Sequence, residues 1–155
     1  FLLPEDPAAN LLMIATGTGL APFRGFLRMR DVMPKRGRGR AFLVFGAQTS
    51  SDLLYQDEIA RHLGHPEDHL TYALSREQKN ATGGRMYVGD RLAELAEQLW
   101  PLVEAKNLYV YVCGIKGMEK SIEDVLGAMA ARAGLDWAAH KAELVAEKRW
   151  MVETY

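Results

Sequence analysis

The sequence predicts an α/β fold: a doubly wound, mostly parallel five-stranded sheet with helices on both faces, which is a Rossmann-like architecture. Short, continuous apolar runs alternate with helix-like segments four or five times along the 155 residues. Such runs are typical of strands that are buried on both faces. Hydrophobic residues make up 48% and charged residues 25% of the chain. This composition is globular and allows one domain with a sizeable core.

Each expected element has its own signal. Pro22 stands in the first turn of a helix, and Ser50 or Ser51 is expected to cap the next one. Pro101 is expected to interrupt a third helix, and Gly134 to end a fourth. The expected strands are Leu11–Ala15, Ala41–Phe45, Leu70–Leu74, Leu108–Cys113 and a terminal strand within Arg149–Tyr155. The expected helices are Ala21–Met33, Asp52–Leu63, Asp90–Ala105, Lys116–Ala133 and Trp137–Glu147.

The bulk composition excludes several classes of protein. A net charge of −1 gives no reason to expect binding to nucleic acid or to an anionic membrane. The single cysteine, Cys113, excludes an internal disulfide and favours a reducing compartment. No apolar run is long enough to span a membrane. Because the chain begins at Phe1, we expect it to be part of a longer protein, located in the cytoplasm or, as the alternative, in the plastid stroma.

Two glycines follow the first expected strand, in Thr16-Gly17-Thr18-Gly19. Glycines let a backbone approach a phosphate, and the N-terminus of the following helix presents free N–H groups. Pyrophosphate binding is therefore the functional interpretation. The pattern is neither G-x-G-x-x-G nor the Walker pattern, so a purely structural tight turn is the alternative.

The stretch T-G-T-G-L-A-P-F-R, residues 16–24, resembles the nucleotide loop of the plant-type ferredoxin–NADP reductase family. Four further stretches agree with that family in the same order: residues 49–55, 74–78, 113–119 and the terminal E-T-Y at 153–155. The resemblance covers essentially the whole chain. It implies an NADP-binding domain over residues 1–155, with an FAD-binding domain upstream and absent from this chain. The flavin motif R-x-Y-[ST] of the family is missing here.

The resemblance assigns the 2′-phosphate and adenine of NADP to Ser75, Arg76, Arg85 and Tyr87. The chemistry fits, because two guanidinium groups can clamp a phosphate dianion and a tyrosine ring can stack on adenine. Without the resemblance, loop arginines are more often simply solvated. In the family, Thr16 and the glycines of the loop contact the nicotinamide side, so Thr16–Gly19 and Gly114 complete the expected cofactor-binding set.

The resemblance also points to catalytic residues, Cys113, Glu153 and Tyr155. Cys113 would lie beside the nicotinamide and position it, Glu153 would place a carboxylate near the flavin edge, and Tyr155 would cover the flavin ring. From the residues alone, Cys113 is a buried apolar side chain and Glu153 a solvated acid. The alternation of residues 150–155 predicts a strand that either carries a site or only completes a sheet edge.

The function implied by the resemblance is that of an NADPH-dependent flavoprotein reductase. Hydride would pass between NADPH and FAD, and electrons would then pass to an iron–sulfur carrier such as ferredoxin. The alternative partner is an oxygenase component, as in a benzoyl-CoA epoxidase system. A nucleotide-binding module without redox activity is a further alternative. The isolated chain is expected to bind nucleotide without catalysing a reaction.

Charged loop residues and histidines suggest no other site. The basic loop Lys35–Arg40 is interpreted as a solvated loop, with docking of an acidic electron carrier as the alternative. The four histidines lack the cysteine or carboxylate partners of a metal site, so no metal is predicted.

Overall fold

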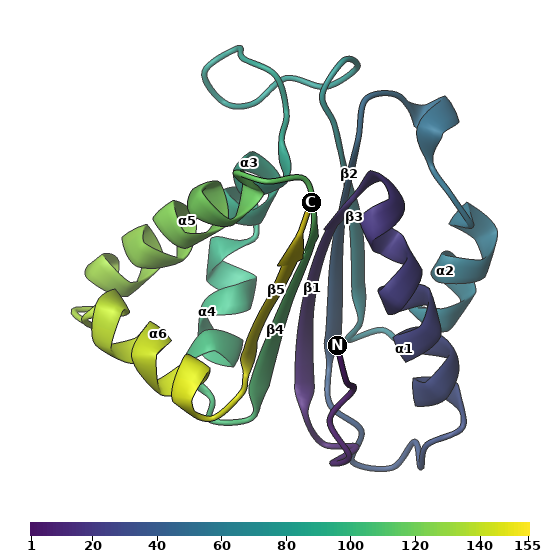
Figure 1. Ribbon diagram of the computed structural model, residues 1–155, viewed down its shortest axis with the longest axis vertical. Coiled ribbons are helices and arrows are strands. Elements are labelled where there is room, and N and C mark those ends of the chain that lie inside the picture. The colour runs from purple at the N-terminus through teal and green to yellow at the C-terminus, as the bar shows by residue number, and fades with distance from the viewer.

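The computed structural model describes residues 1–155 and contains a five-stranded sheet in the order β3-β2-β1-β4-β5. All four strand pairs are parallel, which confirms the doubly wound fold and makes the sheet wholly, not mostly, parallel. The strands are β1 (Asn10–Thr16), β2 (Ala41–Ala47), β3 (His69–Leu74), β4 (Leu108–Gly114) and β5 (Trp150–Thr154). In Figure 1 their carboxyl ends point toward the top.

The strand order reverses beside β1. The chain adds β2 and β3 on one side of β1 and then crosses over to add β4 and β5 on the other side. Thr16 at the end of β1 and Gly114 at the end of β4 therefore lie at the switch point of the sheet. In open α/β sheets, ligands bind outside the carboxyl ends of the strands at this point.

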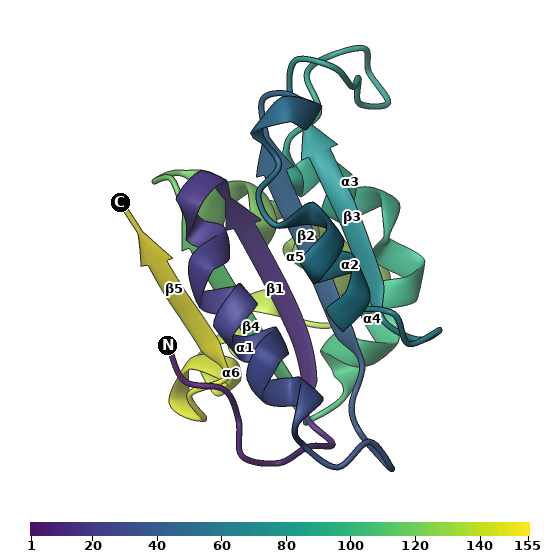
Figure 2. The ribbon, with the colours of Figure 1, turned by 90° about the vertical axis from the view of Figure 1, so that its right-hand side faces the viewer.

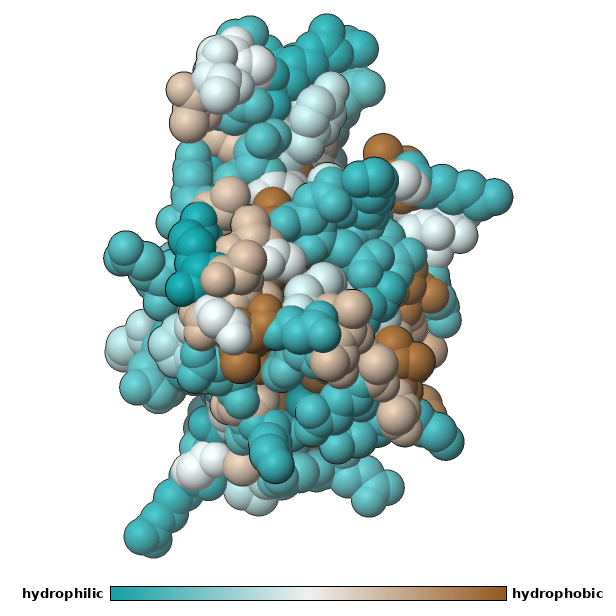
Figure 3. Space-filling view, turned by 90° about the vertical axis from the view of Figure 1, so that its left-hand side faces the viewer, coloured by the Kyte–Doolittle hydropathy of each residue, from teal (hydrophilic) through white to brown (hydrophobic).

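Helices cover both faces of the sheet, as Figures 1 and 2 show. One face carries α1 (Ala21–Asp31) and α2 (Gln56–His62), with Phe23, Leu27 and Ile59 in the core beneath them. The helices of the other face are α3 (Val88–Glu94), α4 (Ala96–Glu104), α5 (Met118–Arg132) and α6 (Trp137–Ala146). The outer surface on that side is mostly hydrophilic (Figure 3). None of the helices combines the length and apolar character that a membrane crossing needs.

The terminal strand is confirmed, and its alternation divides its side chains between the two cores. Trp150 and Val152 pack on the side of α5 and α6, whereas Met151 packs on the side of α1. Trp150 lies edge-on to Trp137 of α6, with ring centroids 5.8 Å apart. Packing on both faces therefore places the last residues of the chain at the carboxyl edge of the sheet.

The helix after β2 begins later than predicted. Residues Ser50–Asp52 form a 3-10 turn, and α2 starts only at Gln56, after Tyr55 with a left-handed φ of 52°. Neither serine caps the helix, because Tyr55 stands at the N-cap of α2 and Thr49 caps the 3-10 turn. The Thr49 N–H and hydroxyl both donate to the Asp52 carboxylate, at 3.1 and 2.9 Å. This side-chain turn competes with helix formation and delays it.

The break predicted at Pro101 is wrong. The helical region divides at Leu95, between α3 and α4, and Pro101 lies inside α4. Pro101 is exposed, so water can replace the backbone hydrogen bond that a proline cannot make. Leu95 is buried at the bend, so packing against the core fixes the direction change there.

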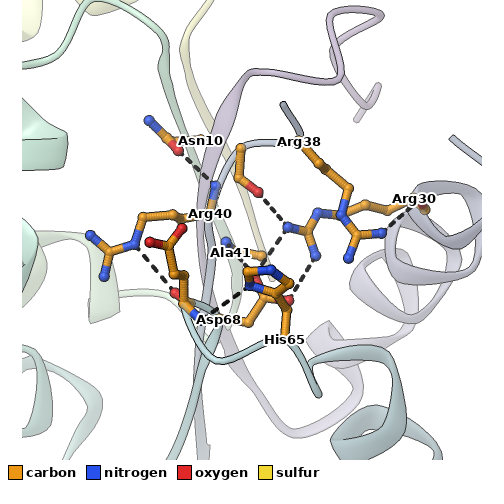
Figure 4. A network of polar contacts seen from close by, with 9 residues as sticks. Asn10, Arg30, Arg38, Arg40, Ala41, His65 and Asp68 are labelled. Carbon is orange, nitrogen blue, oxygen red and sulfur yellow. Dashed lines mark hydrogen bonds and ion pairs between the residues drawn. The ribbon is translucent and has the colours of Figure 1, made fainter. Parts of the chain in front are cut away.

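A buried ion pair ties α1 to the starts of β2 and β3 (Figure 4). The Arg30 guanidinium donates to both oxygens of Asp68, at 3.1 and 3.0 Å, and Asp68 also accepts from the Ala41 N–H at 3.1 Å. The two side chains are only 5% and 1% exposed. The basic loop lies at this edge, opposite the carboxyl ends, and Arg38 donates to the Arg30 carbonyl there.

We expect Asp68→Asn to lower the free energy of unfolding by about 3 kcal/mol, because it leaves the Arg30 charge buried without a counter-ion. Urea denaturation followed by circular dichroism measures the change. Asp124→Asn is the control, since it breaks a solvent-exposed pair with Lys120 and should change stability little. Equal losses in the two variants would show that the buried pair has no special role.

Candidate functional site

The loop after β1 is pressed against the end of β4. Gly17–Leu20 forms a 3-10 turn that leads directly into α1. A Cβ added to Gly19 would stand 2.2 Å from the Cys113 carbonyl oxygen, a distance that no side chain tolerates. Gly17 has a φ of 55°, which also favours glycine. The structure therefore requires glycine at both positions of the loop. The backbone of the loop lies beside the switch point of the sheet.

The ends of β1 and β4 are joined through Thr16. Its hydroxyl accepts from the Ile115 N–H at 3.1 Å and lies 3.5 Å from the Met118 sulfur. Gly114 has a φ of 150°, and a Cβ there would stand 2.0 Å from the Thr16 hydroxyl. Only glycine allows this contact, so the two strands end close together.

Tyr155 is held over the glycine loop at both its backbone and its phenol. Its N–H donates to the Gly114 carbonyl at 2.9 Å, and its own carbonyl accepts from the Lys116 N–H at 3.1 Å. Its hydroxyl lies 2.8 Å from the hydroxyl of Thr18. The residue is nevertheless 60% exposed. Hydrogen bonds therefore hold the chain end in place while most of the residue remains open to solvent.

Cys113 and Glu153 are paired across neighbouring strands, β4 and β5. Burial raises the pKa of the Cys113 thiol, and the negative charge of Glu153 raises that pKa further. The thiol is therefore protonated at neutral pH and is no nucleophile. Glu153 is exposed. The pair places a neutral thiol and an anionic carboxylate side by side.

The second group of predicted residues follows β3. Ser75 and Arg76 continue the strand, with N–H groups that donate to the carbonyls of Ala47 and Gln48 at 3.0 and 2.9 Å. Arg76 and Arg85 are exposed, and neither guanidinium takes part in an ion pair or hydrogen bond within the chain. Five of the other ten arginines are paired with carboxylates, whereas these two retain their full capacity to bind an anion. Tyr87 is 55% exposed.

The structure brings the first group together but keeps the second group apart from it. Thr16, Thr18, Gly114 and Tyr155 are in contact, whereas Ser75 follows β3, two strands away from β1. Two strand spacings are roughly 10 Å. Both groups lie along the carboxyl edge of one sheet, so their arrangement suits an extended ligand with an anionic group at one end.

Residues that the sequence reasoning missed shape the second group. Glu77 accepts from both the N–H and the hydroxyl of Ser50, each at 3.0 Å, which ties the loop after β3 to the loop after β2. Asn80 and Asp90 organise the segment that carries Arg85. The run Asn80-Ala81-Thr82-Gly83-Gly84 contains residues typical of turns, and this composition is the sequence signal for the segment.

A comparison of the sequence with known families decides what kind of domain this is. The family described as the oxidoreductase NAD-binding domain matches residues 13–124, from β1 into α5. The chain belongs to that family. The matched region includes the glycine loop, the segment that carries Arg76 and Arg85, and Cys113, and it stops before the terminal strand.

Similar proteins include several ferredoxin–NADP reductases, which confirms the resemblance. The chloroplastic leaf isozyme 1 of Oryza sativa subsp. indica is 46% identical over 99% of this chain and 44% of its own length. The Synechocystis enzyme is 46% identical over 99% of the chain and 38% of its own length. The Thermosynechococcus vestitus enzyme is 47% identical, with 99% and 42% covered. The chain thus spans less than half the length of these relatives.

We expect the Cys113 thiol to titrate above its ordinary pKa of 9.0, because burial and Glu153 both disfavour the thiolate. The pH dependence of the rate of alkylation by iodoacetamide, followed by mass spectrometry, gives the midpoint. Glu153→Gln removes the nearby charge, so the midpoint should fall toward 9.0. Glu143→Gln is a distant control and should not move it. A midpoint below 9.0 in the unsubstituted protein would contradict the assignment.

Proposed function

We propose that residues 1–155 form the NADP(H)-binding half of a flavoprotein reductase, which passes hydride between NADPH and FAD and then electrons to an iron–sulfur carrier. The observation that carries the proposal is the exposed Tyr155 ring, held by the Thr18 hydroxyl above the glycine loop at the switch point. Binding of a nucleotide alone does not require an aromatic ring at this position. The similarity to ferredoxin–NADP reductases over 99% of the chain supports the same function.

The two groups of residues fit the two ends of NADP. Ser75, Arg76 and Arg85 would hold the 2′-phosphate, and Tyr87 would stack on the adenine. The fit rests on the exposed, unpaired state of both guanidinium groups. The loop Thr16–Gly19, together with Gly114, would approach the rest of the dinucleotide, because Gly17 and Thr18 are exposed and the loop leads directly into the N-terminus of α1.

Cys113, Glu153 and Tyr155 would act on the reacting end. Nicotinamide and flavin, when bound, supply the hydride and electron-transfer chemistry themselves. The neutral Cys113 thiol is buried at the end of β4, so it would act by packing and orientation, and its raised pKa argues against covalent catalysis. Glu153 provides a carboxylate beside it. Tyr155 would occupy the stacking position and exclude water until nicotinamide replaces its ring.

An FAD-binding domain is part of the same proposal. We place the FAD-binding domain upstream of Phe1, since the chain lacks the family's flavin motif and covers 44% or less of the compared relatives. Ferredoxin is the proposed electron acceptor, because the relatives are named as ferredoxin–NADP reductases. An oxygenase component is the alternative acceptor, and NADPH-driven reduction of each candidate by the full-length protein distinguishes them.

The proposed 2′-phosphate site predicts a strong preference for NADP(H) over NAD(H). Replacing Arg76 and Arg85 by alanine should weaken NADPH binding by about 2–4 kcal/mol, since each charged hydrogen-bonding partner contributes about 1.5–3 kcal/mol and such effects overlap. NADH binding should barely change. Isothermal titration calorimetry with both nucleotides measures the two effects.

The matched control for this double variant is replacement of Arg36 and Arg132 by alanine, which removes the same charge from two exposed arginines outside the site. This control should leave both affinities unchanged. Equal losses of NADPH and NADH binding in the Arg76/Arg85 variant would contradict the assignment of a 2′-phosphate site.

A second prediction concerns the ring of Tyr155. In the full-length protein, Tyr155→Ser should tighten NADP binding, because nicotinamide would no longer have to displace a stacked ring, whose contact contributes about 0.5–1.5 kcal/mol. Turnover should fall, since a nicotinamide that stacks too well leaves slowly. Dissociation constants and steady-state rates test both statements. Tyr109→Ser is the control, because Tyr109 lies in β4 away from the glycine loop. Weaker NADP binding in Tyr155→Ser would overturn the stacking role.

A further inference from the structure

The segment between β3 and α3 has little apolar support. Leu74 and Met86 at its two ends are buried, whereas residues 81–85 are exposed. Beyond Arg76, its one strand-like contact is an isolated antiparallel bridge between Lys79 and Arg85. In Figure 1 the segment projects beyond the carboxyl ends of the strands, and the projecting lobe in Figure 3 is mostly hydrophilic. Hydrogen bonds must therefore set its shape.

The side chain of Asn80 lies at the centre of these hydrogen bonds. Its carbonyl oxygen accepts from the Thr82 N–H at 3.1 Å, the Thr82 hydroxyl at 3.0 Å and the Gly84 N–H at 2.8 Å. Its NH₂ group donates to the Arg85 carbonyl and to Asp90, each at 3.3 Å. The side-chain amide of Asn80 thus uses its donors and its acceptor at the same time. Few other side chains can do both, so Asn80 is difficult to replace.

The two glycines allow the chain to wrap around this amide. Gly83 has a φ of 84°, a conformation that side chains disfavour. A Cβ on Gly84 would stand only 3.2 Å from the Asn80 side-chain nitrogen. The backbone closes the turn as well, since the Asn80 N–H donates to the Gly84 carbonyl at 2.9 Å. The glycine pair and Asn80 therefore form one unit.

Asp90 connects this unit to the rigid part of the domain. One carboxylate oxygen accepts from Asn80, and the other accepts from the Tyr87 N–H at 2.9 Å. Asp90 lies in the first turn of α3, whose Val88 and Leu92 are buried in the core. Helix α3 therefore fixes both the position of Tyr87 and, through Asn80, the turn formed by residues 80–84.

Arg85 depends on this arrangement through its backbone alone. Its guanidinium makes no contact that would hold it, whereas its carbonyl is bound by Asn80 and the next N–H, of Met86, donates to Gln78 at 3.3 Å. A flexible side chain can reach a ligand repeatedly only if its point of attachment is fixed. Arg85 is therefore the residue that would bind the ligand, and Asn80 is the separate residue that holds the Arg85 backbone in place.

We propose that Asn80 is a positioning residue that acts through Arg85 and thereby sets the preference for a 2′-phosphorylated nucleotide. This inference rests on the proposed function, because it concerns the same site. Asn80 need not touch the nucleotide. It fixes the Arg85 carbonyl and the turn before it. The backbone to which the Arg85 side chain is attached therefore has one position rather than many.

The test is a double-mutant cycle in the full-length protein, with adenosine 2′,5′-bisphosphate and 5′-AMP as probes that differ by the 2′-phosphate. Asn80→Ala should weaken binding of the bisphosphate about ten-fold and leave 5′-AMP within two-fold. In an Arg85→Ala background, Asn80→Ala should have no further effect, because the residue through which it acts is gone. A merely structural role would lower both affinities and persist in that background.

Two further variants control the experiment. Thr82→Ala removes one partner of Asn80 but leaves the bond to the Arg85 carbonyl, so it should stay within two-fold for both probes. Asn80→Ser keeps a hydroxyl for the turn but cannot also reach that carbonyl, and it should repeat the selective loss even if Asn80→Ala does not fold.

The outcomes separate the inference from the proposed function. If the unsubstituted protein binds both probes equally, the proposed NADP preference and this inference both fail. If it prefers the bisphosphate and the Asn80 variants keep that preference, only the inference is overturned. Additive losses of Asn80→Ala and Arg85→Ala would also overturn it, because Asn80 would then act independently of Arg85.

Discussion

The close approach of β1 and β4 at their carboxyl ends is the constraint on which the site depends. Glycines at positions 19 and 114 leave room for the Cys113 carbonyl and the Thr16 hydroxyl, at distances where any Cβ would collide. Because the two strands end together, β5 can place Tyr155 beside Gly114 and its phenol against Thr18. The close approach of the two strands at the switch point thus depends on the lack of a side chain at Gly19 and at Gly114.

The two halves of the site are held by different forces. The half at β1, β4 and β5 belongs to strands with a hydrophobic core on each face of the sheet, so packing fixes it. The half after β3 projects from the domain and relies on hydrogen bonds of Asn80, Glu77 and Asp90. A substitution in the core should therefore affect the whole domain, whereas a substitution in the projecting segment should affect one end of the ligand.

Much of this arrangement could be predicted from sequence, because apolar runs such as Leu11–Ala15 and Leu108–Cys113 report burial directly. The start of α2 at Gln56 and the bend at Leu95 could not, since a side-chain turn at Thr49 and core packing decided them. Asn80 was missed for a related reason. Its contacts reach Thr82, Gly84, Arg85 and Asp90, and no periodic pattern encodes such a set.

Arg85 is supported in a different way from the buried Arg30. A guanidinium on a packed helix or strand would be fixed by its neighbours and would also be neutralised by them, as Arg30 of α1 is by Asp68. Arg85 avoids this because its support comes through a backbone carbonyl, which leaves the charge unpaired. A neutral amide is suited to that task, since a carboxylate in its place would attract the guanidinium and compete with a phosphate. An asparagine, rather than an aspartate, at the centre of the projecting segment therefore keeps an arginine both positioned and available.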